Sequence, residues 1–356
     1  MQQHGLTSRT RPVAIWLLAG VFMIMVQVLL GGITRLTGSG LSITDWDPIM
    51  GALPPLNHAQ WMAAFHLYQQ TPQYRLVNAD FTLGNFKSIF FWEWLHRNWA
   101  RLIGVVFLVP FVWFLIRRRF QDWMIRPLLI LFLLGGLQGL IGWVMVKSGL
   151  AGDNISVNPV KLSIHFMTAM VLLCYTLWFA LMLLVPDRER TAQRQQHRLT
   201  VLLIVLLAVQ LTYGGFMAGL HAALSAHTWP DINGMLIPDT LWMQHPWWTN
   251  LTGNPILVQF IHRSLGYAIF LLLLYWWARA RRLATTRLSR GWYWVPVVLV
   301  FVQVCLGILV LIHSRIHIPV FLGVMHQMVA MLLLMSLFIN LYLNGGAGRK
   351  AGALQG

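Results

Sequence analysis

Four histidines lie inside apolar stretches of this sequence, and their positions define two pairs. They are His96 and His165 in the first half, and His262 and His326 in the second. Within each half, both histidines fall on stretches that would cross a membrane in the same direction, so the imidazoles lie at similar depth. Two imidazoles without a third protein ligand suit a six-coordinate haem iron better than zinc. One such histidine alone is more often a hydrogen-bonded core residue, but four at matched positions favour two bis-histidine haem sites.

A carboxylate and a guanidinium accompany the first histidine of the first pair. Glu93, His96 and Arg97 are three and four residues apart, which places all three on one face of a helix. Ionisable groups at membrane depth are energetically expensive and mark functional sites. The second half has Gln259 three residues before His262, and an amide cannot carry a proton at neutral pH. We therefore expect the first half to react and the second half to hold a fixed cofactor.

Three arginines lie beside these histidines and are candidates for binding haem propionates. They are Arg97, Arg101 and Arg263. The planar fork of a guanidinium matches a carboxylate, which favours this role. Long basic side chains near helix ends also extend towards the membrane interface without binding any ligand. The sequence leaves these two interpretations open.

The composition defines an integral membrane protein. The chain has 356 residues, of which 57% are hydrophobic and only 10% charged, whereas soluble domains carry roughly 25% charged residues. Eight apolar stretches are each long enough to cross a bilayer core as a helix. They span residues 13–34, 93–116, 124–146, 160–185, 199–220, 257–278, 292–313 and 318–343.

The net charge of +16 is distributed along the chain in a way that excludes a nucleic-acid surface. Arginines gather at both termini and in the connections after the second, fourth and sixth apolar stretches. The positive-inside rule makes that side cytoplasmic. Both termini are therefore expected in the cytoplasm, and the histidine pairs are expected near the outer, periplasmic face.

The sequence contains an internal repeat. Val26–Gly32 recurs as Val209–Gly215 at an offset of 183, and His96-Arg97 recurs as His262-Arg263 at an offset of 166. Both halves contain an even number of spans, so the repeats are parallel rather than inverted. We predict an all-α membrane protein of eight transmembrane helices, arranged as two pseudo-two-fold-related four-helix bundles. The halves are residues 1–190, with the reacting site, and 191–356, with the fixed haem.

A Gln-x-x-x-Gly motif occurs once on each odd-numbered span. The four copies are Gln27/Gly31, Gln138/Gly142, Gln210/Gly214 and Gln303/Gly307. Helix packing explains them, because glycine permits close approach and an amide can hydrogen-bond across helices. The alternative is that the glycines make room for a flat macrocycle.

The first connecting loop is longer than its counterpart by 17 residues, since the repeat offset falls from 183 to 166 across it. It is rich in aromatic residues, among them Tyr68, Tyr74, Phe81, Phe86 and Phe90. A lid over the first site and not over the second would suit a substrate that enters and leaves.

Several of these segments resemble haem A synthases of the mitochondrial and alphaproteobacterial type. The resemblance lies in Gly31–Trp46, Pro54-Pro55, Phe86–Phe90 and the Glu93-x-x-His96-Arg97 motif, and it extends over essentially the whole chain. It implies an oxidoreductase of the bacterial inner membrane. Such an enzyme oxidises a ring methyl of haem O to a formyl group, through a hydroxymethyl intermediate, and so supplies haem A to terminal oxidases.

The resemblance also implies roles for individual residues. His96 and His165 would flank the substrate, haem O or its product haem A, and Glu93 would be the catalytic carboxylate. His262 and His326 would hold a b-type haem. Implied partners are haem O, a transient contact with haem O synthase, an electron acceptor of unknown identity, and membrane lipid. Whether the chain forms a homo-oligomer stays open.

Two other functions account for part of the pattern. A quinol-linked di-haem cytochrome b would have two equivalent permanent haems and no need for a unique carboxylate. A non-catalytic haem carrier would explain the two histidine pairs but not the difference between Glu93 and Gln259.

Overall fold

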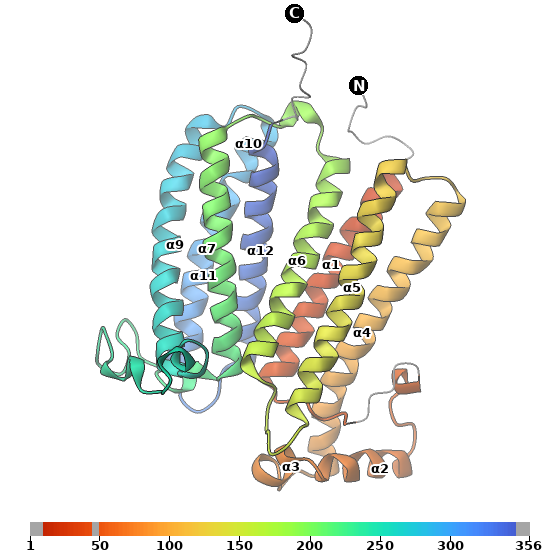
Figure 1. Ribbon diagram of the computed structural model, residues 1–356, viewed down its shortest axis with the longest axis vertical. Helices are drawn as coiled ribbons and strands as arrows, with labels where there is room; N and C mark the ends of the chain where they lie inside the picture. Colours follow the sequence, from red (N-terminus) through yellow and green to blue (C-terminus); the bar gives the residue numbers. More distant parts are fainter. Residues whose placement is uncertain (1–9, 45–49, 347–356) are drawn as a thin grey trace, which may run out of the picture.

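The computed structural model of the chain describes residues 10–44 and 50–346. Within them, eight helices are long and apolar enough to cross a membrane, and no strand occurs. Figure 1 shows these helices as two neighbouring groups of four. The first group is α1 (Arg11–Leu36), α4 (Leu83–Ile116), α5 (Asp122–Gly149) and α6 (Pro159–Leu184), and the second is α7 (Arg194–Gly219), α9 (Pro255–Leu283), α11 (Trp294–His313) and α12 (Val320–Asn344).

The eight predicted spans are confirmed, and the largest difference is at the start of α4. We predicted that this helix begins at residue 93, but it begins at Leu83. Thr82 and Asn85 form a capping box, in which each side chain accepts a hydrogen bond from the other residue's backbone N–H. Capping satisfies N–H groups that have no partner inside the helix, so it stabilises a start outside the apolar stretch.

The two groups meet along α1, α6, α7 and α12. Each contact within the first group has a counterpart in the second: α1 packs on α4 and α6, as α7 packs on α9 and α12. Across the boundary, α6 packs on α7 and α1 packs on α12. The largest hydrophobic core cluster lies at this boundary and includes Leu173, Leu207 and Leu334. This contact pattern is the one that a two-fold relation requires, and the relation itself stays a prediction.

Both described ends of the chain lie at one end of the bundle, which we call the terminus end (Figure 1). The long connections lie at the opposite end, the loop end. The basic residues expected in the cytoplasm at positions 1–9 and 347–356 lie outside the described residues, as do Asp45 and Trp46 of the family motif.

The first long connection folds into two short helices at the loop end, α2 (His58–Gln69) and α3 (Pro72–Val77). Their aromatic residues pack on the start of α4, where Phe65, Tyr68 and Phe86 form a separate buried cluster. No described residue between 50 and 92 lines the large cavity of the protein. The prediction that these aromatic residues cover the first site is therefore wrong for the described residues, because their side chains pack against one another instead.

Glycine permits the closest contact between the two groups of helices. A Cβ atom at Gly219 of α7 would lie 2.8 Å from the Cα of Pro159 in α6. We expect Gly219→Ala to force the helices apart and to destabilise the protein by about 1–3 kcal/mol, the usual effect of overpacking. Thermal unfolding in detergent measures this effect. Gly139→Ala is the matched control, because nothing lies within 4 Å of that Cβ. Equal unfolding temperatures for the two variants would contradict the prediction.

Candidate functional site: a cavity lined by two histidine pairs

One continuous cavity of about 1480 Å³ extends through both groups of helices. All four predicted histidines line it: His96 from α4, His165 from α6, His262 from α9 and His326 from α12. Pockets for single small ligands have volumes of about 300–1,000 Å³. This volume therefore exceeds what one small ligand needs and is suited to two macrocycles.

Each histidine ring packs against the glycine of one Gln-x-x-x-Gly motif on a neighbouring helix. The distance from a Cβ atom at the glycine to the nearest ring atom would be 3.2 Å for Gly31 and His96, 2.8 Å for Gly142 and His165, 3.6 Å for Gly214 and His262, and 3.0 Å for Gly307 and His326. The first, second and fourth distances are too short for a relaxed contact. The glycines are thus required where an imidazole must lie directly against a helix backbone.

The glutamine of the motif hydrogen-bonds to the same histidine in three of the four copies. The amide nitrogen of Gln138 lies 3.2 Å from His165 Nδ1, that of Gln210 lies 3.4 Å from His262 Nε2, and that of Gln303 lies 3.2 Å from His326 Nε2. An amide nitrogen can only donate, so each of these ring nitrogens is the acceptor. The packing interpretation of the motif is therefore the one that the contacts support, and its role is to position the histidines.

The second pair fits the requirements of a bis-histidine haem. The ring centroids of His262 and His326 are 6.4 Å apart. A metal–nitrogen bond of about 2.0 Å, plus about 1.1 Å from nitrogen to ring centre, would give a centroid separation of about 6.2 Å for two imidazoles that bind one ion. Among the described residues, no group of three or more metal-ligating side chains occurs.

Glu93 is the centre of a compact polar network at the first pair. It is 2% exposed and lines the cavity. Its carboxylate accepts hydrogen bonds from Ser42 Oγ at 2.7 Å, from the backbone N–H of Ile43 at 2.8 Å and from Arg97 Nη2 at 2.5 Å. The same Arg97 nitrogen donates to the carbonyl of Ile43 at 3.0 Å. Three donors, one of them the charged guanidinium of Arg97, hold the carboxylate in one orientation.

Gln259 occupies the matching position with the opposite hydrogen-bonding polarity. Its amide nitrogen donates to the carbonyls of Ala222 and Ala226, at 2.9 and 3.0 Å. Its oxygen accepts from Arg263 at 2.5 Å, and Arg263 also donates to the carbonyl of Asp231 at 2.7 Å. The loop next to Glu93 presents donors, whereas the loop next to Gln259 presents acceptors. The difference between the halves therefore extends from the side chain to the backbone around it.

The three predicted arginines have different surroundings. Arg97 forms an ion pair with Glu93, and Arg263 binds Gln259 and loop carbonyls. Arg101 Nη1 donates to Asn98 Oδ1 at 3.2 Å. All three line the cavity. Their binding of propionates stays a prediction.

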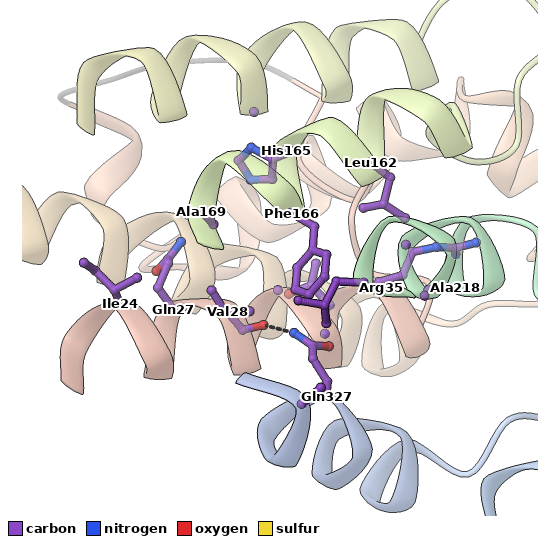
Figure 2. A pocket seen from close by; sticks show the side chains of 18 of the residues that line it. Ile24, Gln27, Val28, Arg35, Leu162, His165, Phe166, Ala169, Ala218 and Gln327 are labelled. Carbon is purple, nitrogen blue, oxygen red and sulfur yellow. Dashed lines mark hydrogen bonds between the residues drawn. The ribbon is translucent and has the colours of Figure 1, made fainter. Parts of the chain in front are cut away.

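Sequence reasoning missed Arg35, which connects the two halves. From the end of α1, its Nη2 atom donates to the carbonyl of Gly219 at 2.9 Å and lies 3.1 Å from Nδ1 of His221. Its Nε atom is buried without a partner, and the side chain lines the cavity near Ala218 (Figure 2). Ala218 is also its counterpart at the repeat offset of 183. The replacement of arginine by alanine between the two repeats could have identified Arg35 as a candidate site residue, as the replacement of Glu93 by Gln259 identified Glu93.

A second contact across the halves lies next to a predicted ligand. Gln327, which follows His326 on α12, donates from Nε2 to the carbonyl of Val28 on α1 at 2.8 Å (Figure 2). Gly31, three residues further along α1, packs against His96. One segment of α1 thus contacts both the His96 ring and the helix that carries His326.

The fold and site define a multi-pass, all-helical membrane protein with two buried histidine pairs on one cavity. Comparison with known proteins agrees with this class. The model of a family described as cytochrome oxidase assembly protein matches residues 14–338. The chain therefore belongs to this family.

The individual relatives carry the name Heme A synthase. That of Brucella suis is 43% identical over 340 residues, which cover 94% of this chain and 93% of the relative. That of Cereibacter sphaeroides is 41% identical over 320 residues, covering 86% and 81%. The predicted resemblance to haem A synthases of alphaproteobacteria is confirmed.

The tight contact at Gly142 allows a test of how the glycines position the histidines. We expect Gly142→Ala to displace the His165 ring, because the new Cβ would lie 2.8 Å from Cε1, and to reduce haem bound in the first half by several-fold. Gly214→Ala is the control, since its 3.6 Å contact with His262 is an ordinary one. Haem per protein after purification is the measurement. Equal haem content in both variants would contradict this role of the glycine.

His221 lies in the connection after α7 and gives the protein a pH-dependent stability. Burial, and then the Arg35 charge, lower the pKa of His221 from its ordinary value of 6.5 to about 4. Between these values the unfolded chain binds a proton that the folded protein does not, so stability falls as the pH drops from 6.5 to 4. We expect His221→Asn to flatten this fall, since asparagine tolerates the left-handed backbone (φ 49°) at this position. Unfolding temperatures measured over that pH range provide the test, and parallel curves would refute it.

Proposed function

We propose that this protein is a haem A synthase, which oxidises a ring methyl of haem O to a formyl group through a hydroxymethyl intermediate. The observation that carries the proposal is the buried Glu93–Arg97 pair beside His96, set against Gln259 at the matching place in the second half. Two haem sites that only transfer electrons do not require this difference. The names of the relatives agree with the proposal.

In the first half, His96 and His165 flank the substrate, and Glu93 is the catalytic residue. A carboxylate that lines the cavity can accept a proton from the substrate carbon or stabilise positive charge that develops there. Ser42 and the Ile43 N–H fix the orientation of the carboxylate. Arg97 compensates its charge between turnovers.

In the second half, His262 and His326 would hold a b-type haem, which would supply one-electron transfer. The surrounding residues fit this group, because both rings line the cavity and have the required separation. The division into a reacting half, residues 1–190, and a cofactor half, residues 191–356, follows from these assignments.

The protein is proposed to lie in the bacterial inner membrane with both termini in the cytoplasm. Arginines of the described connections at the terminus end, such as Arg118, Arg188 and Arg282, support this orientation by the positive-inside rule. The histidine pairs then lie towards the periplasm. The proposed partners are haem O, haem O synthase in a transient contact, and an electron acceptor.

The replacement of Glu93 by glutamine tests the reaction and the role of the carboxylate together. The new amide nitrogen would face either the Ser42 hydroxyl and the Ile43 N–H or the Arg97 guanidinium, all of which donate to the native carboxylate, and it cannot accept a proton. We expect formation of haem A to fall by at least about 100-fold, with haem O or the hydroxymethyl intermediate accumulating. Extraction and mass analysis of haems from the purified proteins, expressed with haem O supplied, measure this.

Asp187→Asn is the matched control, because it removes the carboxylate of the other ion pair found among the described residues, Arg190–Asp187. It should leave the haem composition unchanged. Haem B alone in both the wild type and Glu93→Gln, at equal stoichiometry, would instead identify an electron-transfer cytochrome.

A further inference from the structure

In the first half, the cavity continues well beyond the histidines towards the terminus end. Beyond His96 it is lined by Gly20 of α1, Gly104 of α4, Gly136 of α5 and Thr176 of α6. It ends at an aromatic floor, where Phe107 stacks on Trp16 at 4.8 Å and touches Phe132 at 4.5 Å between ring centroids. From Gly31 to Gly20, this extension follows α1 for about 16 Å at the helical rise of roughly 1.5 Å per residue.

In the second half the extension is shorter: it reaches Ile269 and Val300, and larger side chains fill the region beyond them. At the repeat offset of 183, Leu203 takes the place of Gly20, and at 166, Leu273 takes the place of Phe107. Both leucines are fully buried, and neither lines the cavity. The far end of the matching region is therefore hydrophobic core.

The difference is clearest between the second and third membrane helices of each half. Gly104 of α4 and Gly136 of α5 have nothing within 4 Å of an added Cβ atom. Their repeat counterparts, at offsets of 166 and 165, are Phe270 and Phe301, whose rings meet edge to face at 4.9 Å. An aromatic pair thus closes the second half at the level where the first half is open.

The opening faces the outside of the bundle. Gly104, Gly135, Gly136 and Gly139 are exposed and also line the cavity. Whereas α9 packs closely on α11, α4 and α5 make few close contacts, and α4 is at the edge of the bundle (Figure 1). Because this level lies within the apolar spans, the opening connects the cavity to the hydrocarbon region of the membrane.

We infer that this glycine-lined opening and the extension behind it bind the isoprenoid tail of the substrate macrocycle, which enters sideways from the bilayer between α4 and α5. The inference rests on the proposed function, since haem O carries a farnesyl-derived tail and haem B does not. A site in the first half alone matches a tail carried by the substrate alone. Burial of the tail contributes binding free energy that a tail-less haem cannot obtain. The extension therefore selects haem O for the first half, and the filled core of the second half admits only haem B.

The double variant Gly104→Phe with Gly136→Phe tests this inference by giving the first half the aromatic pair of the second. Full-length proteins are purified from cells that supply haem O, and their haems are extracted and counted. We expect haem O plus haem A per protein to fall at least tenfold, with haem B taking their place in the first half and the second-half haem B retained. Haem O plus haem A at the wild-type level would overturn the inference.

The control double variant is Val105→Phe with Leu137→Phe. These neighbours on the same two helices are 55% and 45% exposed and do not line the cavity. They should leave the haem composition unchanged. Native mass spectrometry provides a third measurement. A phospholipid that is bound to the wild type and lost from the Gly104→Phe/Gly136→Phe variant, with haem O and haem A unchanged, would show that the opening holds membrane lipid. That result would refute the inference.

Gly20→Leu decides the case if the double phenylalanine variant loses all haem through misfolding. A Cβ atom at Gly20 would meet only Thr176 Cγ2, at 3.7 Å, so the helix can accept a side chain that fills the extension as Leu203 does. We expect the same selective loss of haem O and haem A, and their retention would overturn the inference. Wild-type protein that contains only haem B would instead overturn the proposed function, whatever the variants show.

Discussion

The structure depends on the close approach of imidazole rings to helix backbones. Four histidines must lie in an apolar interior, and each does so against a glycine; at three of the four glycines, an added Cβ atom would lie too close to the ring. Three of the rings also accept a hydrogen bond from a glutamine one turn away on the same helix as that glycine. A buried ring nitrogen without a partner is energetically costly, so the motif both makes room for the ring and satisfies one of its nitrogens. The helix pairs that carry glycine and histidine are thereby fixed in register, and the cavity follows from their separation.

The two halves use the same arrangement of helices but differ at a few positions beside the cavity. Glu93 and Gln259 hold similar places, but the loops beside them offer donors in one case and acceptors in the other. A substitution at this position alone would therefore not convert one half into the other. Between the histidines and the terminus end, glycines line the cavity in the first half, whereas leucine and phenylalanine side chains fill the corresponding positions of the second half. The matched helices supply the common framework, and these differences make the two ends of the cavity unequal.

Much of this could be predicted from the sequence. The eight spans and the four cavity-lining histidines follow from hydropathy and repeat spacing, which depend on local composition. The contacts of Arg35 could not be predicted. Its partners Gly219 and His221 are more than 180 residues away, and only the packing of α1 against the second half brings them near. The aromatic residues of α2 and α3 were misplaced for a related reason. Composition shows that such side chains will be buried, but not whether against the cavity or against one another.

The length of α4 fixes how far Glu93 lies from water. The helix has 34 residues, about 51 Å at roughly 1.5 Å per residue, which is much longer than a hydrocarbon core of about 30 Å. Arg117, Arg118 and Arg119 follow its last residue and anchor that end at one headgroup layer. The helix needs about 20 residues to cross the hydrocarbon core. Counted back from Ile116, that length ends at the turn that carries Glu93 and Arg97. Glu93 therefore lies only a short distance from the aqueous phase, while the opening between α4 and α5 lies in the hydrocarbon interior. A polar and an apolar species can thus reach the same cavity by separate routes.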